Sequence, residues 1–371
     1  MRVVALGDAH LGRSYYPYLA ADGANQREVD FEDSFTAAIE VALSARPDLV
    51  VWLGDIFDHP RPSYRSFRLA QAGLARIREY GVPAVVISGN HDTPRLPGRG
   101  SPYGALADAF PEFGFAHRMA YERFDIGDVV VHAVPQMLTV QATLAALGQA
   151  EEHKSADHSN LLLTHPRLAQ VEPRYSDINE IEVDAEELRA DLVLLGHYHT
   201  HTQVAPNIWY AGSTDTFSFG DDPAVAKGVV VLDTTSGQCR HLSVPNQRRL
   251  VTLETVEAWD LSPHELQDAV LDRVSAVPDG AVARLYIDGV EPEAYRLLEL
   301  DAVRRAGRAA LHIKLDPTFA DVASEVDMPD LDSLGSRWAR YIVDQELKGF
   351  DKAELDRLGR EYLTRAVEQS G

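Results

Sequence analysis

The amino-terminal two thirds of the chain alternate between short apolar runs and turns rich in Gly, Asp and His. Six runs are almost continuously apolar: VVALGD (3–8), DLVVWLGD (48–55), PAVVISGN (83–90), VVVHAVP (129–135), LLLTH (161–165) and DLVLLGH (191–197). Because apolar and polar residues do not alternate within them, these runs predict strands buried on both faces. Amphipathic helices are expected between them, over 33–44 and over 64–80, where Gly81 suits a helix end. The pattern predicts an α/β layered fold in which helices flank the β-sheets.

A second, smaller α/β unit is expected after the first. The strand LVTLETV leads to a helix opened by a capping box at Ser262 and Glu265, and the strand AVARLYI (281–287) follows. A helix over 293–305 and the strand AALHIKL (309–315) complete a β-α-β-α-β order. We therefore expect a main domain over 1–245, a small α/β domain over 246–316, an acidic linker over 317–330 and a helical segment over 331–371.

Composition is that of an ordinary soluble globular protein, with 45% hydrophobic and 25% charged residues. No apolar run reaches the roughly 18–20 residues of a membrane span, and the start reads as a buried strand rather than a signal peptide. Cys239 is the only cysteine, which excludes a disulfide framework and a thiolate metal site. The sequence predicts a cytoplasmic protein without membrane contact.

The formal net charge of −22 changes the expectation about partners. Proteins that bind DNA without a partner usually carry a basic face. An acidic balance is more typical of a small-molecule enzyme, or of a subunit that leaves most phosphate contacts to a partner.

Polar side chains stand where five of the predicted strands end. They are Asp8 and His10 after the first run, Asp55 and Asp58 after the second, Asn90, His91 and Asp92 after the third, His165 after LLLTH, and His197 and His199 in GHYH. Each ending alone is compatible with a plain turn. Five such endings in one sheet are better explained by a metal site, because plain turns would have to account for each ending separately. Residues at i and i+2 lie on the same side of a strand, so Asp8 and His10 could share one ion.

The donor set consists of Asp, Asn and His without Cys. It suits Mn²⁺, Fe²⁺ or Zn²⁺ better than Ca²⁺, and its oxygen share favours Mn²⁺, with Mg²⁺ as a further alternative. Two ions ~3.5–4 Å apart, bridged by one carboxylate, would form a clamp for in-line displacement at phosphorus. A protonated imidazole beside the leaving oxygen would complete such a site.

The series D-x-H, GD-x-x-D, GNHD, a strand-end His and GH-x-H resembles that of the calcineurin-like metallophosphoesterases. The phrases GDIFDHPRPS and YAGSTDTFSFGDD (210–222) are similar to stretches of the SbcD-type DNA double-strand-break repair nucleases. The resemblance covers roughly residues 1–235 and implies a metallophosphoesterase domain over 1–245. It also implies that the second unit is a capping domain that positions DNA.

The resemblance further implies a role for each matching residue. One metal would be held by Asp8, His10, Asp55 and His199, and the other by Asp55, Asn90, His165 and His197, with Asp55 bridging. His91 would act on the leaving group, and Asp92 would orient it. Among other polar side chains, we expect Asp58 to support a ligand rather than to be one, His59 to be solvated, and His132 to be a core residue. His201 is left out of the site.

Two loops and the start of one helix could contact a polymer. The candidates are Arg13 and Tyr15 in 11–29, Arg61 and Arg65 after the GDIFD motif, and Arg95, Arg99 and Tyr103 in 93–104. Arginine interleaved with tyrosine suits phosphate contact and base stacking. Solvated arginines and tyrosines that pack the loops are the alternative.

The favoured function is a Mn²⁺-dependent, dimeric DNA exonuclease (3′–5′) and endonuclease acting on DNA ends with an ATPase partner. The last 40 or so residues resemble, more loosely, the segment that docks onto the SbcC coiled-coil ATPase, and amphipathic helices suit such docking. They could equally fold back on the chain. The alternatives are a small-molecule phosphodiesterase or phosphatase of the same superfamily, and a scaffold without catalysis.

Overall fold

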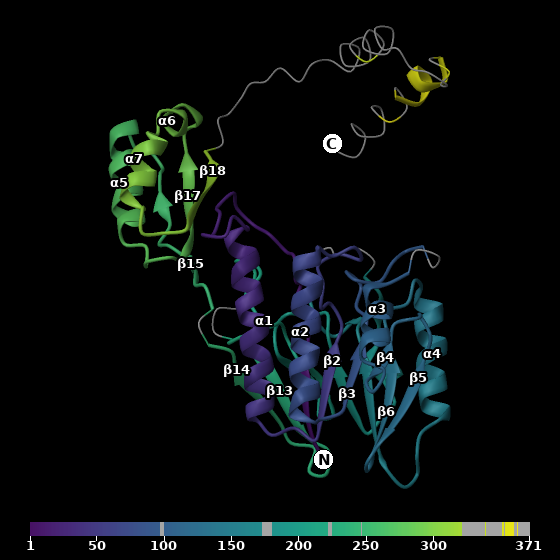
Figure 1. Cartoon of the computed structure of the whole chain (residues 1–371). Coiled ribbons are helices and arrows are strands. Elements are labelled where there is room, and N and C mark those ends of the chain that lie inside the picture. Colours follow the sequence, from purple (N-terminus) through teal and green to yellow (C-terminus); the bar gives the residue numbers. More distant parts are fainter. Residues whose placement is uncertain are drawn as a thin grey trace. The chain divides into compact units, whose positions relative to one another are not determined.

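The computed structural model describes residues 1–96, 100–172, 180–221, 225–245 and 247–320, together with 338, 351, 353–359 and 362. Two six-stranded sheets form its main body (Figure 1). The first has the order β14 (Cys239–Ser243), β13 (Gly228–Asp233), β1 (Arg2–Leu6), β2 (Leu49–Leu53), β3 (Ala84–Ile87) and β4 (Gly114–Ala116). The second has the order β11 (Thr202–Ala205), β12 (Ile208–Tyr210), β10 (Leu192–Leu195), β7 (Ser159–Thr164), β6 (Val129–Val134) and β5 (Glu122–Ile126).

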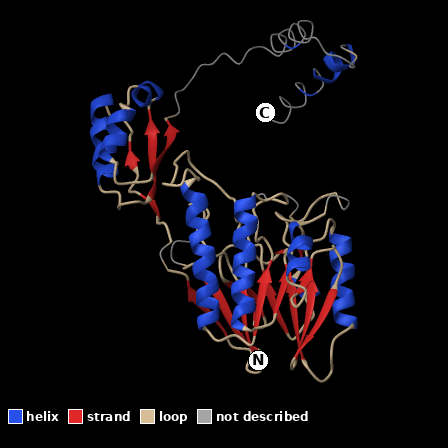
Figure 2. Cartoon of the chain, viewed as in Figure 1, coloured by secondary structure: helices blue, strands red, loops and turns tan. Residues whose placement is uncertain are grey.

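The two sheets pack face to face, and helices cover their outer faces (Figure 2). In β1, Val3 and Ala5 belong to the core between the sheets, whereas Val4 and Leu6 belong to the core beneath the helices. Both faces of the strand are therefore buried, which explains its unbroken apolar run. The predicted layered fold is confirmed. The strands that carry polar ends lie in two facing sheets, however, so the expectation of a single sheet is wrong.

The first sheet is covered by α1 (Gln26–Ser44), α2 (Tyr64–Tyr80) and α3 (Pro102–Ala109), and the second by α4 (Val140–Glu152). Helix α2 has the predicted bounds, with Ser63 as N-cap and Gly81 at φ 82° as C-cap. Helix α1 begins at Gln26 rather than Asp33, because the Asn25 side chain caps its first turn. Apolar periodicity alone missed that turn, which carries the buried Arg27.

The central strands β1, β2 and β3 run parallel, as do β6, β7 and β10. Their carboxyl ends therefore meet at one edge of each sheet, where such folds place their ligands. Short elements surround this body, namely β8 (Arg167–Leu168), β9 (Glu182–Val183) and the 3₁₀ turn Ala185–Glu187.

A separate small sheet is formed by β15 (Leu250–Thr252), β17 (Val282–Val290), β16 (Val256–Glu257) and β18 (His312–Phe319). Its helices are α5 (Pro263–Ser275), α6 (Pro292–Arg296) and α7 (Leu300–Ala306). The capping box at Ser262 and Glu265 is present, with reciprocal hydrogen bonds. The prediction of a single helix over 293–305 is wrong. Helix α6 has its C-cap at Leu297, which is 66% exposed, and the buried Leu298 lies between this helix and α7 in the chain.

Residues 353–359 are helical, within the segment predicted to be helical. Most of that segment and of the predicted linker lies outside the described residues, and the predicted domain boundaries remain predictions. None of the helices in the described part combines the length and apolar character that crossing a membrane requires.

Candidate metal centre

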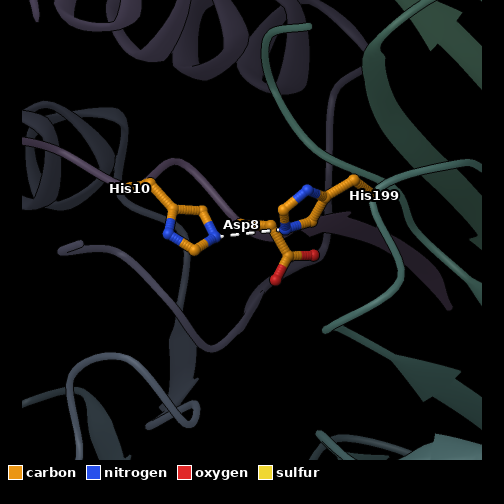
Figure 3. A group of neighbouring side chains, drawn as sticks. All are labelled: Asp8, His10 and His199. Carbon is orange, nitrogen blue, oxygen red and sulfur yellow. Dashed lines mark hydrogen bonds between the residues drawn. The ribbon is translucent and has the colours of Figure 1, made fainter. Parts of the chain in front are cut away.

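The seven predicted ligands come together at the carboxyl ends of five strands. Asp8 and His10 follow β1, Asp55 follows β2, Asn90 follows β3, His165 follows β7, and His197 and His199 follow β10. All are buried except His197 and His199, which are partly buried. Figure 3 shows Asp8 and His10 converging with His199, a residue that lies far along the sequence.

The backbone is bent into an uncommon conformation at four of these positions. Asp8, His10, Asp55 and His197 have φ angles of 50°, 47°, 49° and 84°. Few non-glycine residues adopt positive φ, and residues that do so cluster at functional sites. The turns at the strand ends thus hold the side chains of these candidate ligands in directions that an ordinary strand would not give them.

Glycines before the ligands allow these turns to pack together. A Cβ atom on Gly89 would lie 2.1 Å from Oδ1 of Asp55, and one on Gly196 would lie 2.0 Å from the carbonyl oxygen of Leu53. Neither distance is sterically possible. The glycines of the GN and GH motifs are therefore required by the close approach of neighbouring strand ends.

One group of ligand atoms is made by Asp8, His10 and His199. Nδ1 of His10 donates to Oδ1 of Asp58 at 3.0 Å, so Nε2 presents a lone pair toward the centre. That Nε2 lies 3.2 Å from Nε2 of His199. Burial lowers the pKa of both histidines, and the neutral imidazole it favours is the form that binds metals.

A second group contains His165, His197 and Asn90. Nδ1 of His165 donates to the carbonyl oxygen of Leu53 at 2.5 Å, which turns its Nε2 toward Oδ1 of Asn90, 3.1 Å away. Oδ1 of Asn90 also lies 3.0 Å from Nδ1 of His197. Nitrogen and oxygen acceptors therefore face one another in this group, as they do around a bound cation.

Asp55 lies between the two groups. Its Oδ2 is 3.6 Å from Nε2 of His10 and 3.2 Å from Nε2 of His165, while its Oδ1 accepts a hydrogen bond of 2.9 Å from the His91 amide. Burial opposes ionisation of Asp55, but the histidines around it, His165 first, hold its pKa below the ordinary value. Asp55 is therefore placed to be shared by two ions.

Charge is concentrated strongly in this buried space. Burial raises the pKa of Asp8 to about 7, against the opposing effect of His165. Burial would lower the pKa of His165, but Asp55 and Asp8 hold it at about 9. Carboxylate oxygens and imidazole lone pairs that crowd together in a buried space are stabilised by a cation, so this donor set fits two divalent ions.

His91 stands at the open side of the centre, with 17% of its side chain exposed. Its Nδ1 lies 3.2 Å from the carbonyl oxygen of Asp58 and 3.6 Å from Oδ1 of the same residue. Asp92 contacts other groups: it accepts from the Gly89 amide at 2.9 Å and from the Tyr103 hydroxyl at 2.5 Å. The geometry thus offers Asp58 for the orienting role that the resemblance gave to Asp92.

Comparison with known proteins shows which family the residues around this centre match. Residues 1–201 match the family described as Calcineurin-like phosphoesterase. The chain belongs to this family. The matched region contains every residue of the two groups and His91, and the prediction of a metallophosphoesterase is confirmed.

Several curated relatives of this phosphoesterase carry the name DNA double-strand break repair protein Mre11. The Thermoplasma acidophilum protein is 28% identical over 242 residues, which are 62% of this chain and 61% of that protein. The Saccharolobus solfataricus protein is 26% identical over 58% of this chain and 55% of its own length. The Halobacterium salinarum protein is 28% identical over 78% of this chain and 70% of its own length. The chain thus spans little more than half the length of the first two.

The candidate residues for polymer contact differ from one another in burial and in ion pairing. Arg13 lies beside the centre, 3.1 Å from Asp58, and its Nε donates to the Tyr15 hydroxyl. Arg65 is bound to Asp22 and Glu32, each at 2.6 Å. Arg61 and Arg95 are exposed, and Arg99 lies outside the described residues. Tyr103 is fully buried, so of the two alternatives it is a tyrosine that packs the loop and not one that contacts a polymer.

Three histidines outside the centre, His59, His132 and His201, have the surroundings that the sequence predicted. His59 is exposed, and its Nδ1 accepts from the Arg61 amide. His132 is buried and bonded to Tyr121 and Asn160, which makes it a core residue. His201 is directed to the carbonyl oxygen of Tyr210 rather than to the ligand groups.

Three side chains near the centre were not predicted from the sequence. Oε2 of Glu180 lies 3.5 Å from Nε2 of His197, the ring of Phe217 lies against His10 and His199, and Nζ of Lys227 donates to the His199 carbonyl. None of them stands in a motif of ligand type. Only the stretch YAGSTDTFSFGDD, noted for its resemblance, included one of them.

Proposed function

We propose that this chain is a two-metal nuclease that cuts DNA ends in double-strand-break repair, with 3′–5′ exonuclease and endonuclease activity. The position of Asp55 between two groups of ligand atoms carries the proposal, because a shared carboxylate is what a two-ion clamp on a phosphodiester requires. The ions would be Mn²⁺, which suits oxygen and imidazole donors without thiolate.

The residues would divide between the ions as the two groups do. Asp8, His10 and His199 would hold one ion, and Asn90, His165 and His197 the other, with Asp55 bound to both. When bound, the ions supply a nucleophilic hydroxide and neutralise charge on the phosphoryl oxygens. The buried walls of the centre exclude bulk water, which strengthens electrostatic interactions within it.

His91 would act as the general acid. Its Nδ1 is placed against Asp58, whose negative charge favours the imidazolium form. Nε2 is then the atom from which a proton would pass to the leaving oxygen. The partial exposure of His91 is consistent with a substrate that approaches from that side.

DNA as the substrate is supported by the names of the relatives and by the arginines near the centre. Likeness to the Halobacterium protein covers 78% of this chain, well beyond the 201 residues of the family match. Arg13 lies beside the centre, where it pairs with Asp58, and Arg61 and Arg95 are exposed in the loops that follow β2 and β3. We further propose a homodimer in the cytoplasm that works with an SbcC-type coiled-coil ATPase, which would supply the phosphate contacts that an acidic chain lacks.

The nuclease proposal is tested with purified protein and end-labelled duplex DNA in Mn²⁺. We expect shortening of the labelled strand by the wild type, and none by His91→Gln, although that variant should still bind two ions. His59→Gln is the matched control, since His59 is an exposed histidine outside the centre, and it should cut as the wild type does. Intact DNA with the wild type in the presence of Mn²⁺ would refute the nuclease.

A small-molecule phosphodiesterase is the second candidate, and the charge distribution favours it. The net charge is −22, and the guanidinium of Arg65 is neutralised by two carboxylates. Rapid hydrolysis of bis(p-nitrophenyl) phosphate with no cleavage of DNA at equal enzyme concentration would establish this candidate instead.

The ATPase partner is tested by truncation. Removing residues 329–371 should abolish co-purification with a coiled-coil ATPase while leaving the bound metal unchanged. Retention of the ATPase by the truncated chain would show that the partner binds elsewhere.

A further inference from the structure

The ring of Phe217 lies against two ligands of a single ion. Phe217 follows β12 in the chain and is 4% exposed. Its centroid is 4.8 Å from that of His10, in an edge-on arrangement, and 4.4 Å from that of His199. In the part of the chain that the structure describes, no ring contact joins Phe217 to His165 or His197.

The ring is held from its other sides as well. Phe31 of α1 stacks on it with centroids 4.9 Å apart and planes 21° apart. The guanidinium of Arg13 lies 5.1 Å from its centroid, within the range of a cation–π contact. A ring fixed in this way can restrict the rotation of the two imidazoles that it touches.

One buried ion pair anchors both the ring and the ligand. Oδ2 of Asp221 accepts from the Phe217 amide at 2.7 Å and from the Ser218 amide at 3.2 Å. The same oxygen is 3.5 Å from Nζ of Lys227, and both side chains are almost fully buried, at 1% and 3% exposed. Nζ of Lys227 donates to the His199 carbonyl oxygen at 2.5 Å. Asp221 and Lys227 therefore fix the backbone of Phe217 relative to that of His199.

We propose that Phe217 is a positioning residue for one of the two metal ions. It holds the imidazoles of His10 and His199 in ligating orientation and keeps water from their outer side. The ion held by Asn90, His165 and His197 does not depend on it. This inference rests on the two-metal centre of the proposed function.

The proposal predicts an asymmetric loss of metal. Without the ring, His10 and His199 gain rotational freedom, and water enters the space beside them. Loss of residues that orient metal ligands typically weakens binding about 10–100-fold. We expect this loss for one ion in Phe217→Ala and no loss for the other.

The test is Mn²⁺ binding to the full-length metal-free protein in chelator-buffered solutions, followed by low-temperature electron paramagnetic resonance. The wild type should bind two ions per chain and show an exchange-coupled pair. At Mn²⁺ concentrations that fill both sites of the wild type, Phe217→Ala should show the spectrum of an isolated ion. Phe217→Leu, which restores most of the volume, should recover part of the coupled signal.

Phe35→Ala is the matched control. Phe35 is also a buried phenylalanine, 2% exposed, but it packs against Trp52 in the core beneath the helices. This variant should lower stability toward urea and still bind a coupled pair. A coupled pair of wild-type affinity in Phe217→Ala, or equal loss of both ions there but not in Phe35→Ala, would overturn the proposal.

Asp221→Asn and Lys227→Met provide a second test that keeps the ring. Each should weaken the same single ion, because each loosens the connection between Phe217 and His199. Wild-type affinity for both ions in both variants would show that the Asp221–Lys227 ion pair does not hold Phe217 in position against His199. Failure of the wild type itself to bind two ions would refute the two-metal centre rather than the role of Phe217.

Discussion

Asp58 accepts a hydrogen bond of 3.0 Å from Nδ1 of His10, and this bond directs Nε2 of the imidazole into the metal centre. The same carboxylate oxygen lies 3.6 Å from Nδ1 of His91. Asp58 thus connects His10, a proposed ligand of one ion, to His91, the proposed acid. A carboxylate that contacts a ligating histidine also raises the basicity of that ligand.

Asp58→Asn should therefore weaken metal binding about 10–100-fold while preserving the shape of the side chain. It should also lower the rate of cleavage at saturating metal, because His91 loses the nearby charge that favours its protonated form. Metal affinity is measured by competition with a chelator. Asp125→Asn is the control, since Asp125 is 66% exposed and pairs with Arg123. Equal affinities in both variants would contradict the role of Asp58.

Tyr103→Phe tests the connection between two of the strand ends. The Tyr103 hydroxyl donates to Asp92 at 2.5 Å and accepts from the Ile56 amide at 3.3 Å, so it joins the turn after β2 to the turn after β3. Removing a buried hydroxyl that is bonded to an acidic group should cost about 1.5–3 kcal/mol of unfolding free energy. Urea titration measures the loss. A change smaller than about 0.5 kcal/mol, the range of ordinary surface substitutions, would show that the turns are held by other contacts.

Gly89→Ala should remove the metal centre. The added Cβ would lie 2.1 Å from Oδ1 and 2.6 Å from Cγ of Asp55, so the shared carboxylate must move. We expect loss of both ions, measured by metal analysis after gel filtration. Gly148→Ala is the matched control: this glycine lies in α4 with open space around its Cα atom, and alanine there should stabilise the helix by about 1 kcal/mol. Retention of two ions in Gly89→Ala would refute the prediction.

His241 predicts a loss of stability toward acid. Burial, together with the smaller effects of His201, stacked 5.0 Å away, and of Lys227, lowers the pKa of His241 to about 4. The unfolded chain has a pKa of about 6.5 for histidine, so the unfolded state binds the extra proton first. The contribution of neutral His241 to the free energy of unfolding is therefore complete above a pH of about 6.5 and is lost as the pH falls toward 4. Discounted for partial exposure of the ring, it should amount to about 1–2 kcal/mol.

The measurement is the free energy of unfolding in urea between pH 4 and 7. His241→Gln should flatten the decline of stability over this range, whereas His59→Gln, at an exposed histidine, should leave it unchanged. An unaltered slope in His241→Gln would assign the acid sensitivity to other groups.

The sequence by itself determined the residue types of the candidate ligands and the strands that carry them. Buried strands leave an unbroken apolar run, and a polar residue directly after such a run has no packing explanation, so Asp8, Asn90 and His165 could be recognised locally. The glycines of the motifs were also visible, because the turns they permit are local. The bounds of α2 followed in the same way, from Ser63 and Gly81 at its ends.

Only the tertiary structure decided how these ends meet. The pairing of β1, β2 and β3 in one sheet and of β7 and β10 in the other depends on contacts between residues far apart in the chain, which periodicity does not encode. For the same reason the sequence could not show that Asp58 holds His10, that Tyr103 is buried against Asp92, or that Phe217 covers two imidazoles. The candidate ligands stand at strand ends, which can be read locally from the sequence, whereas the side chains that orient them are brought there by the packing between the two sheets and their helices.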